Sequence, residues 1–220
     1  MELDPISKKI GTGLENIRVF KNFIEEEDRK KILAYCESHD GPDTGELFYS
    51  IPHPENSELL DLHIKYTIKM FDNLSSYYDP ICKIRYPELL DSNGNFNHEH
   101  RRTLSSILAH PMGSFMHPHV DIVGYLQDKD NAIQDHLSKW SGHLSSVIYL
   151  NDNYEGGELY FKDHGVSIKP EAGDYITFPG NRHYQHGVKE VSGAVRYTLS
   201  TWVRFEDAYG KEMYSYGIEK

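Results

Sequence analysis

Cysteine is scarce in this sequence, and long apolar runs are missing. Only Cys36 and Cys82 occur among the 220 residues, and their spacing forms no CxxC motif. A disulfide framework is therefore excluded, zinc ligation by paired cysteines lacks its usual spacing, and a reducing compartment is favoured. No segment approaches the ~20 apolar residues of a membrane span, and the first residues, MELDPISKK, contain no apolar signal core. We expect a soluble, cytoplasmic protein without a membrane partner.

Positive charge is also in short supply. Lysine and arginine number 23 against 34 aspartates and glutamates, which gives a net charge of −11. Such a chain has no electrostatic footprint for nucleic acid, so an acidic ligand must meet locally placed positive charge. The 38% hydrophobic and 12% aromatic content is typical of a globular protein. We expect a single domain over residues 1–220, because this length suffices for one substantial core.

The amino-terminal part, about residues 17–80, predicts helical support for the rest of the chain. IRVF at 17–20 is suited to a short strand, and Asn22 followed by Glu25 predicts a capped helix that ends near His39. A second helix is predicted by apolar residues at helical spacing and ends near Tyr78. The residues expected in the core are Ile32, Leu33 and Cys36 in the first helix and Leu60, Ile64, Ile68 and Phe71 in the second.

From Thr103 onward the apolar residues alternate with a period of two, which predicts strands. Gly and Pro residues separate these short segments, and this pattern is typical of a β-sandwich or barrel. The expected strands are 104–110, 115–119, 143–150, 158–161, 166–168, 175–178, 185–188 and 195–205. Gly156 and Gly157 are expected where backbones approach closely, and residues 163–165 and 170–173 are expected to form turns.

Two long polar segments interrupt this pattern. Residues 79–102 are predicted to be a loop in which His98 and His100 are solvated. Residues 122–142 follow the candidate metal strand, so they are either a lid or an ordered insertion with Trp140 as its anchor.

The stretch MGSFMHPHVD at 112–121 carries the first functional signal. Its last residues, His119, Val120 and Asp121, place an imidazole and a carboxylate on one side of an extended segment. Two imidazoles and one carboxylate on one face of a metal form the facial triad of non-haem Fe(II) oxygenases. The pair therefore requires a second histidine from elsewhere. His53 and Glu55 have the same ligand types, but their proline-rich context predicts a loop.

Four segments follow one another in a characteristic order: the His119–Asp121 pair, SSVIYLND at 145–152, EGGELYF at 155–161 and HGVKEVSGAVRYTLSTW at 186–202. With these motifs the chain resembles the Fe(II)- and 2-oxoglutarate-dependent dioxygenases, most closely their prolyl 4-hydroxylase-like branch, over about residues 104–205. The resemblance implies a mainly β fold with flanking helices (α+β). Its core, about residues 103–205, would be a double-stranded β-helix, or jelly roll, with helices packed on the major sheet.

By this resemblance, the iron ligands are His119, Asp121 and His186. Arg196, ten residues after His186, is the residue expected to pair with the distal carboxylate of 2-oxoglutarate, with further contacts from Thr198 and Tyr149. The spacing to Arg196 favours His186 over His183, and the following Asp121 favours His119 over His117. Members of the prolyl hydroxylase branch often carry lysine in place of Arg196, so this departure leaves the subfamily and its substrate open.

The last predicted strand supports these assignments by its alternation. Arg196, Thr198, Ser200 and Trp202 share one face, which suits a polar cavity. The other face carries Val195, Tyr197, Leu199, Val203 and Phe205 and suits packing under the helices.

The implied function is oxidation of a substrate C–H bond with release of succinate and CO2. Fe(II) and 2-oxoglutarate would be the cofactors, dioxygen the oxidant, and ascorbate a candidate reductant. A peptidyl proline is the expected substrate, and a free amino acid or other small metabolite is the alternative. HPH at 117–119 with GDYITFPGNRH at 173–183 also resembles the motifs of cupins, so a non-catalytic metal or ligand binder is the alternative from another class. The sequence specifies no oligomeric state.

Overall fold

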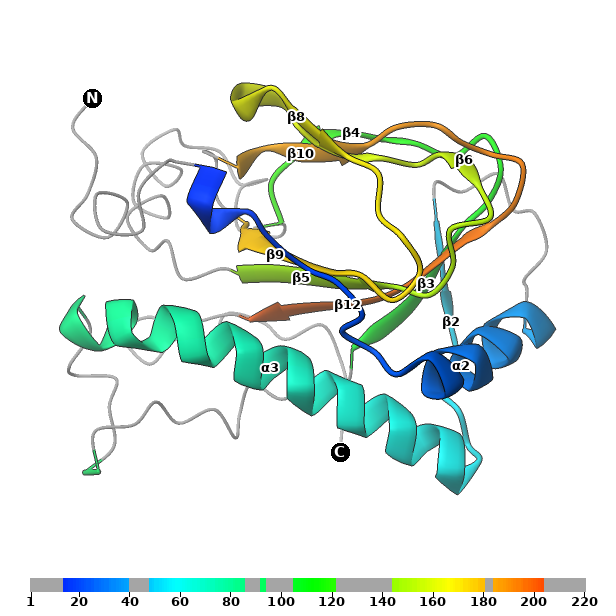
Figure 1. The fold of residues 1–220 in the computed structure, drawn as a ribbon, viewed down its shortest axis with the longest axis horizontal. Coiled ribbons are helices and arrows are strands. Elements are labelled where there is room, and N and C mark those ends of the chain that lie inside the picture. Colours follow the sequence, from blue (N-terminus) through cyan, green and yellow to red (C-terminus); the bar gives the residue numbers. More distant parts are fainter. Residues whose placement is uncertain are drawn as a thin grey trace, which may run out of the picture.

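The computed structural model describes residues 14–39, 48–85, 92–93, 105–121, 144–180 and 184–203. Two antiparallel sheets face each other in this part of the chain, and helices α2 and α3 lie against the outer side of the larger sheet (Figure 1). The arrangement is a jelly roll with helical support, as the sequence predicts. No helix among these residues is long and apolar enough to cross a membrane.

The larger sheet has six strands in the order β1-β9-β5-β12-β3-β2. All neighbouring pairs are antiparallel. The strands are β1 (Arg18–Phe20), β2 (Tyr49–Ile51), β3 (Ser106–His110), β5 (Leu144–Tyr149), β9 (Tyr175–Pro179) and β12 (Arg196–Val203). Strand β12 lies inside the sheet, where it pairs with β3 on one side and with β5 on the other. Its side chains alternate between the face toward the helices and the face toward the smaller sheet.

The smaller sheet has four strands in the order β4-β10-β7-β8. These are β4 (Met116–His119), β7 (Leu159–Phe161), β8 (Val166–Ile168) and β10 (His186–Val188), and a separate pair joins β6 (Glu155–Gly156) to β11 (Val191–Ser192). The register of β4 against β10 shifts between its two paired positions, Met116 opposite Val188 and His119 opposite His186. Because one strand has an extra residue there, a bulge lets Met116 and His119 face the same side.

The helices bury their apolar faces against the larger sheet. They are α2 (Glu26–Ser38) and α3 (Ser57–Arg85), and a short 3-10 turn, η1 (Leu14–Asn16), precedes β1. Ile32 and Cys36 from α2 and Tyr66 and Met70 from α3 belong to one core cluster with the sheet residues Ile107, Ile148, Tyr175 and Leu199. A second cluster fills the space between the sheets, with Tyr149, Ile176 and Phe178 from one sheet and Leu159 and Phe161 from the other.

The predicted start of the first helix is wrong by about three residues. Asn22 has φ 52°, in the left-handed region, and belongs to the turn before the helix. The helix begins at Glu26, and the preceding Glu25 makes no side-chain capping bond. The Glu25 backbone N–H instead donates to the Tyr66 hydroxyl at 3.0 Å. A tertiary contact from α3 therefore takes the place of a local cap.

The second helix is longer than predicted and buries a different stripe. It continues through Pro80 to Arg85. Ile68, expected in the core, is 40% exposed, and of the four expected residues only Phe71 is fully buried. The buried face consists of His63, Tyr66, Thr67, Met70, Phe71 and Leu74. A tyrosine, a histidine and a threonine occupy it because their polar atoms find partners, as described below for His63 and Thr67.

The strand predictions are confirmed within one or two residues, but three short strands were missed. β2 lies in a segment of Gly and Pro punctuation, and its pairing with β3 is a long-range contact that this local pattern does not show. β6 and β11 are only two residues long. Gly156 has φ 64°, and a Cβ there would collide with the Glu190 carbonyl oxygen, which confirms the predicted close approach. Residues 122–142, His98, His100 and His183 lie outside the described residues.

Candidate metal and cosubstrate site

Three potential metal ligands meet between the two sheets. His119 and His186 lie directly opposite each other on β4 and β10, and Asp121 follows the end of β4. The ligand atoms of these residues all lie within 4.8 Å of one another. Nε2 of His119 is 3.5 Å and Nε2 of His186 is 3.4 Å from an Asp121 carboxylate oxygen. Among the described residues, no other histidine, cysteine, aspartate or glutamate joins a comparable cluster.

Backbone carbonyls orient both imidazoles. Nδ1–H of His119 donates to the His117 carbonyl oxygen at 2.8 Å, and Nδ1–H of His186 donates to the Tyr184 carbonyl oxygen at 3.0 Å. Each bond places the ring proton on Nδ1 and leaves the Nε2 lone pair facing Asp121. Partners of this kind hold metal-binding histidines in the correct tautomer. The cluster is therefore prepared to hold a divalent cation with two nitrogens and one carboxylate.

Asp121 is held as a carboxylate. Burial favours its protonated form, but the imidazoles of His186 and His119 and a hydrogen bond from the Ser145 hydroxyl hold its pKa well below the ordinary range. The Asp121 backbone N–H donates to the Gly180 carbonyl oxygen at 3.2 Å, which fixes the residue just beyond the strand. Ser145 was not among the predicted site residues, although it lies on β5 on the same alternation as Tyr149.

Arg196 lies on β12 between the sheets and is only 2% exposed. Its Nε and Nη1 atoms are buried and have no hydrogen-bond partner among the described residues. The guanidinium lies over the Tyr149 ring at 4.9 Å from the centroid, and no described carboxylate pairs with it. A buried cation without a counter-ion is costly, so this arrangement calls for an anionic ligand.

Further unsatisfied polar groups surround Arg196. The Tyr149 and Tyr154 hydroxyls and His110 Nδ1 are buried without a hydrogen-bond partner among the described residues. Burial raises the pKa of Tyr149, and it raises the pKa of Tyr154 to about 12, so both phenols are neutral donors at pH 7. Burial and the charge of Arg196 together hold the pKa of His110 well below its ordinary value. Several buried groups without a hydrogen-bond partner among the described residues thus lie beside one buried cation.

The predicted cosubstrate residues do come together. Thr198 lies directly opposite Tyr149 in the β12–β5 pairing, so the two side chains share the inner face. Thr198 is buried, and its hydroxyl lies 3.4 Å from the Ser200 hydroxyl. Tyr154 and His110 were missed. Neither residue had a signal in the sequence: His110 is placed opposite Arg196 by the pairing of β3 with β12, and Tyr154 follows a strand in a segment without alternation.

The rival histidines lie elsewhere. The His117 side chain is exposed, and its ring contacts the ring of Phe115. His53 lies in a loop next to His63, with ring centroids 5.0 Å apart, and is not part of the metal cluster. The geometry therefore agrees with the choice of His119 over His117.

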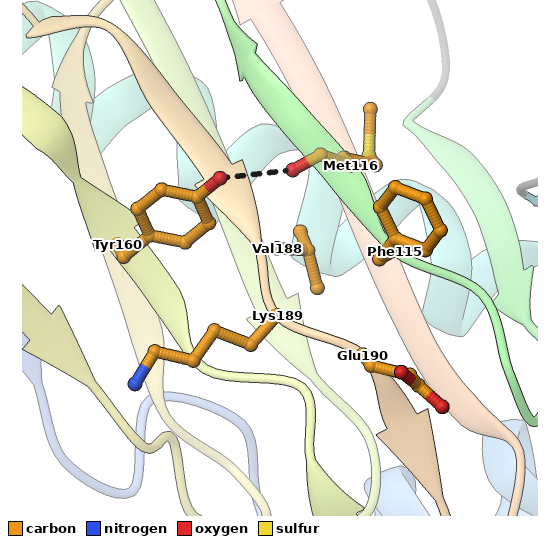
Figure 2. A pocket seen from close by; sticks show the side chains of 6 residues that line it. All are labelled: Phe115, Met116, Tyr160, Val188, Lys189 and Glu190. Atoms are coloured by element: carbon orange, nitrogen blue, oxygen red, sulfur yellow. Dashed lines mark hydrogen bonds between the residues drawn. The ribbon is translucent and has the colours of Figure 1, made fainter.

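A separate open pocket of about 390 Å³ lies at the smaller sheet (Figure 2). Its lining consists of Phe115, Met116, Tyr160, Val188, Lys189 and Glu190. The Tyr160 hydroxyl donates to the Met116 carbonyl oxygen at 3.4 Å, so it is engaged by the backbone of the neighbouring strand. None of the metal cluster residues lines this pocket.

Known proteins are similar to this chain in sequence. Residues 105–204 match the model of the 2OG-Fe(II) oxygenase superfamily. Prolyl 3-hydroxylase 2 from Rattus norvegicus and from Homo sapiens is 36% identical over 70 residues, which cover 30% of this chain and 10% of that protein. The match thus spans only about a tenth of the length of these relatives.

Solved structures show the same fold. A Pseudomonas putida prolyl-4-hydroxylase is similar with a TM-score of 0.58 and 19% identity, covering 90% of this chain and 96% of that one. A Trichoplax adhaerens prolyl hydroxylase, solved with a hypoxia inducible factor peptide, has a TM-score of 0.54 and 17% identity, covering 95% of this chain and 91% of that one.

The donor set fits the cofactors that the family name states. Two imidazole nitrogens and a carboxylate suit Fe(II), and the unpaired guanidinium suits a carboxylate of 2-oxoglutarate. The superfamily match over residues 105–204 contains all of these residues, so this part of the chain is similar to the 2OG-Fe(II) oxygenase superfamily, whose name states Fe(II) and 2-oxoglutarate.

Proposed function

We propose that the protein is a 2-oxoglutarate-dependent dioxygenase that hydroxylates a peptidyl proline. The observation that carries this proposal is the His119–Asp121–His186 cluster in the same inter-sheet space as the buried Arg196 guanidinium, whose Nε and Nη1 atoms have no partner among the described residues. A metal site alone would suit a cupin-like binder, the alternative from another class. A metal site with a buried anion site beside it suits an enzyme that binds a keto acid.

The three cluster residues would hold Fe(II) through the two Nε2 atoms and the Asp121 carboxylate. When bound, the metal supplies the redox chemistry by which O2 oxidises 2-oxoglutarate to succinate and CO2 and one oxygen atom enters a substrate C–H bond. The His117 and Tyr184 carbonyls keep both imidazoles in the ligating tautomer. The Ser145 hydroxyl donates to Asp121 and keeps its carboxylate ionised.

Arg196, Tyr149 and Thr198 would bind the distal carboxylate of 2-oxoglutarate. The guanidinium offers parallel N–H donors that match a carboxylate, and its Nε and Nη1 atoms are unpaired in the described residues. The Tyr149 hydroxyl, also unpaired, can donate from the adjacent strand. Exclusion of water from this inter-sheet space strengthens each of these interactions.

The names of the relatives support a prolyl substrate. One solved neighbour is a prolyl-4-hydroxylase and another is a prolyl hydroxylase with a peptide, which supports the predicted hydroxylation at C4 of a peptidyl residue. The sequence relatives are prolyl 3-hydroxylases, so C3 is the competing position. A free amino acid or other small metabolite is the alternative substrate class.

The test is turnover of 2-oxoglutarate with purified protein, Fe(II) and a panel of proline-containing peptides, with free proline as comparison. We expect succinate in equal amount to a peptide product heavier by one oxygen atom, and NMR of that product identifies C4 or C3. Succinate with hydroxylated free proline instead would favour the small-metabolite reading. Metal binding without any succinate would favour the cupin-like reading and contradict the proposal.

A further inference from the structure

Tyr154 lies beside Arg196 although it is distant from it in sequence. It follows β5, is 3% exposed, and packs with Val188 and Val191. A Cβ at Gly157 would lie 2.7 Å from Tyr154 Cε2 and 3.3 Å from Arg196 Cδ, so both side chains rest on the same glycine. The guanidinium also lies 4.9 Å from the Tyr149 ring centroid. Burial raises the pKa of both tyrosines, and Arg196 opposes that rise in each of them.

The ring of Tyr154 is fixed independently of its hydroxyl. Lys169 Nζ lies 3.9 Å from the ring centroid and donates to the Tyr154 and Gly156 carbonyl oxygens at 2.9 and 2.6 Å. The ring is therefore held by a cation on one side and by apolar contacts on another, and a phenylalanine would satisfy both. The hydroxyl adds a buried polar atom with no partner among the described residues, and such an atom is costly unless a ligand pairs with it.

We propose that the Tyr154 hydroxyl is a fourth ligand of the distal carboxylate of 2-oxoglutarate, beside Arg196, Tyr149 and Thr198, and that Lys169 positions it by anchoring residues 154–156. The inference rests on the proposed function and deepens it. Four donor side chains converging on one carboxylate end would favour keto acids that carry a second carboxylate over those that lack it, because each lost hydrogen bond would leave a buried donor unpaired.

Tyr160 provides a matched control. It lies six residues further along, within the EGGELYF segment that follows Tyr154, but its hydroxyl donates to the Met116 carbonyl oxygen and borders the open pocket (Figure 2). Tyr154→Phe thus removes a hydroxyl beside Arg196. Tyr160→Phe removes a hydroxyl that is hydrogen-bonded to the backbone.

The experiment measures binding of 2-oxoglutarate to the Fe(II)-loaded protein by calorimetry without oxygen. We expect Tyr154→Phe to raise the dissociation constant on the order of tenfold to a hundredfold, because a hydrogen bond to a charged group is lost. Tyr160→Phe should stay within about twofold of the parent. For 2-oxopentanoate, in which a methyl group replaces the distal carboxylate, Tyr154→Phe and the parent should bind equally.

A parallel measurement separates ligand binding from folding. Thermal unfolding of the metal-free Tyr154→Phe protein should occur at or above the temperature of the parent, because no folded-state hydrogen bond is removed. Unchanged 2-oxoglutarate affinity in Tyr154→Phe, with normal binding by the parent, would overturn the assignment of Tyr154 alone. A parent that binds no 2-oxoglutarate would overturn both this inference and the proposed function. Equal weakening for both keto acids would also contradict the assignment, because it would place Tyr154 away from the distal carboxylate.

Discussion

The two faces of the six-stranded sheet differ in how their side chains are satisfied. On the outer face, Leu199, Ile148 and Ile107 are fully buried against α2 and α3. On the inner face the same strands carry Arg196, Thr198 and Tyr149, which are as deeply buried but polar. Successive residues of β12 thus alternate between closing a core and lining a site.

The buried polar groups of the two faces also differ in their hydrogen-bond partners. On the helix side, His63 Nε2 bonds the Ser105 hydroxyl at 2.7 Å, and the Thr67 hydroxyl bonds Ser105 at 2.9 Å. On the inner side, Arg196 and Tyr149 keep buried atoms without partners among the described residues. The helix side also has buried atoms without a partner among the described residues, namely His63 Nδ1, Thr177 Oγ1 and Thr201 Oγ1, but none of them carries a full charge. The inner face differs because its unpaired group is the Arg196 cation, which calls for an anionic ligand.

The largest effect is expected at the metal cluster. Asp121→Ala removes the carboxylate that both imidazoles face, so iron binding and succinate formation should fall below detection while the fold is retained. Iron content after gel filtration and succinate release are the measurements. His117→Ala, at the exposed neighbouring histidine, serves as control and should keep activity. Equal loss in both variants would show that the strand, rather than the ligand, is at fault.

The next effect is expected at Arg196. Arg196→Leu should weaken 2-oxoglutarate binding by about 2–5 kcal/mol, because the carboxylate loses its buried partner. Thr198→Val, which removes one hydroxyl, should cost about 1 kcal/mol. The metal-free Arg196→Leu protein should be no less stable than the parent, because an unpaired buried charge disappears. A large drop in its unfolding temperature would mean that the guanidinium is satisfied within the fold.

A substitution on the opposite face should give the reverse result. Leu199→Ala, three residues from Arg196 on the same strand, leaves a cavity under the helices and should lower the free energy of unfolding by about 2–5 kcal/mol. The affinity of the folded protein for 2-oxoglutarate should not change. Urea unfolding and calorimetry at low temperature measure the two quantities separately. Weakened cosubstrate binding would show that the two faces are not independent.

A further effect on stability concerns the pH dependence of the helix side. Burial lowers the pKa of His63 from 6.5 to about 4, so this imidazole is neutral in the folded protein. Below the unfolded pKa only the unfolded chain takes up the proton, and stability is lost as the pH falls from about 6.5 to about 4. The loss should be on the order of 3 kcal/mol.

His63→Gln should remove that part of the pH dependence. Urea unfolding of both proteins at several pH values between 7 and 4 gives the difference, which cancels the contribution of all other groups. The same change at exposed His39 is the control and should leave the profile as in the parent. Parallel profiles for the parent and His63→Gln would show that His63 takes up its proton in the folded state as well.

Much of this structure could be predicted from the sequence because its strands show the alternation of apolar and polar residues. The strands of the jelly roll and both faces of β12 follow from apolar residues at every second position, and the motif spacing from His119 to Arg196 agrees with the cluster that forms. Patterns failed where a distant contact decides. The predicted cap at Asn22 is replaced by a hydrogen bond that the Glu25 backbone N–H donates to the Tyr66 hydroxyl, and β2 forms by pairing with β3.

The sequence by itself determined which residue types could hold a metal and a keto acid, and in which order the strands carry them. It could not determine that Tyr154 and His110 lie beside Arg196, because Gly157 and the pairing of β3 with β12 create those contacts across many residues of chain. Nor could it show that a bulge in β4 turns His119 inward beside His186. Local alternation sets the face of each side chain, and only the packing of two sheets decides which faces meet.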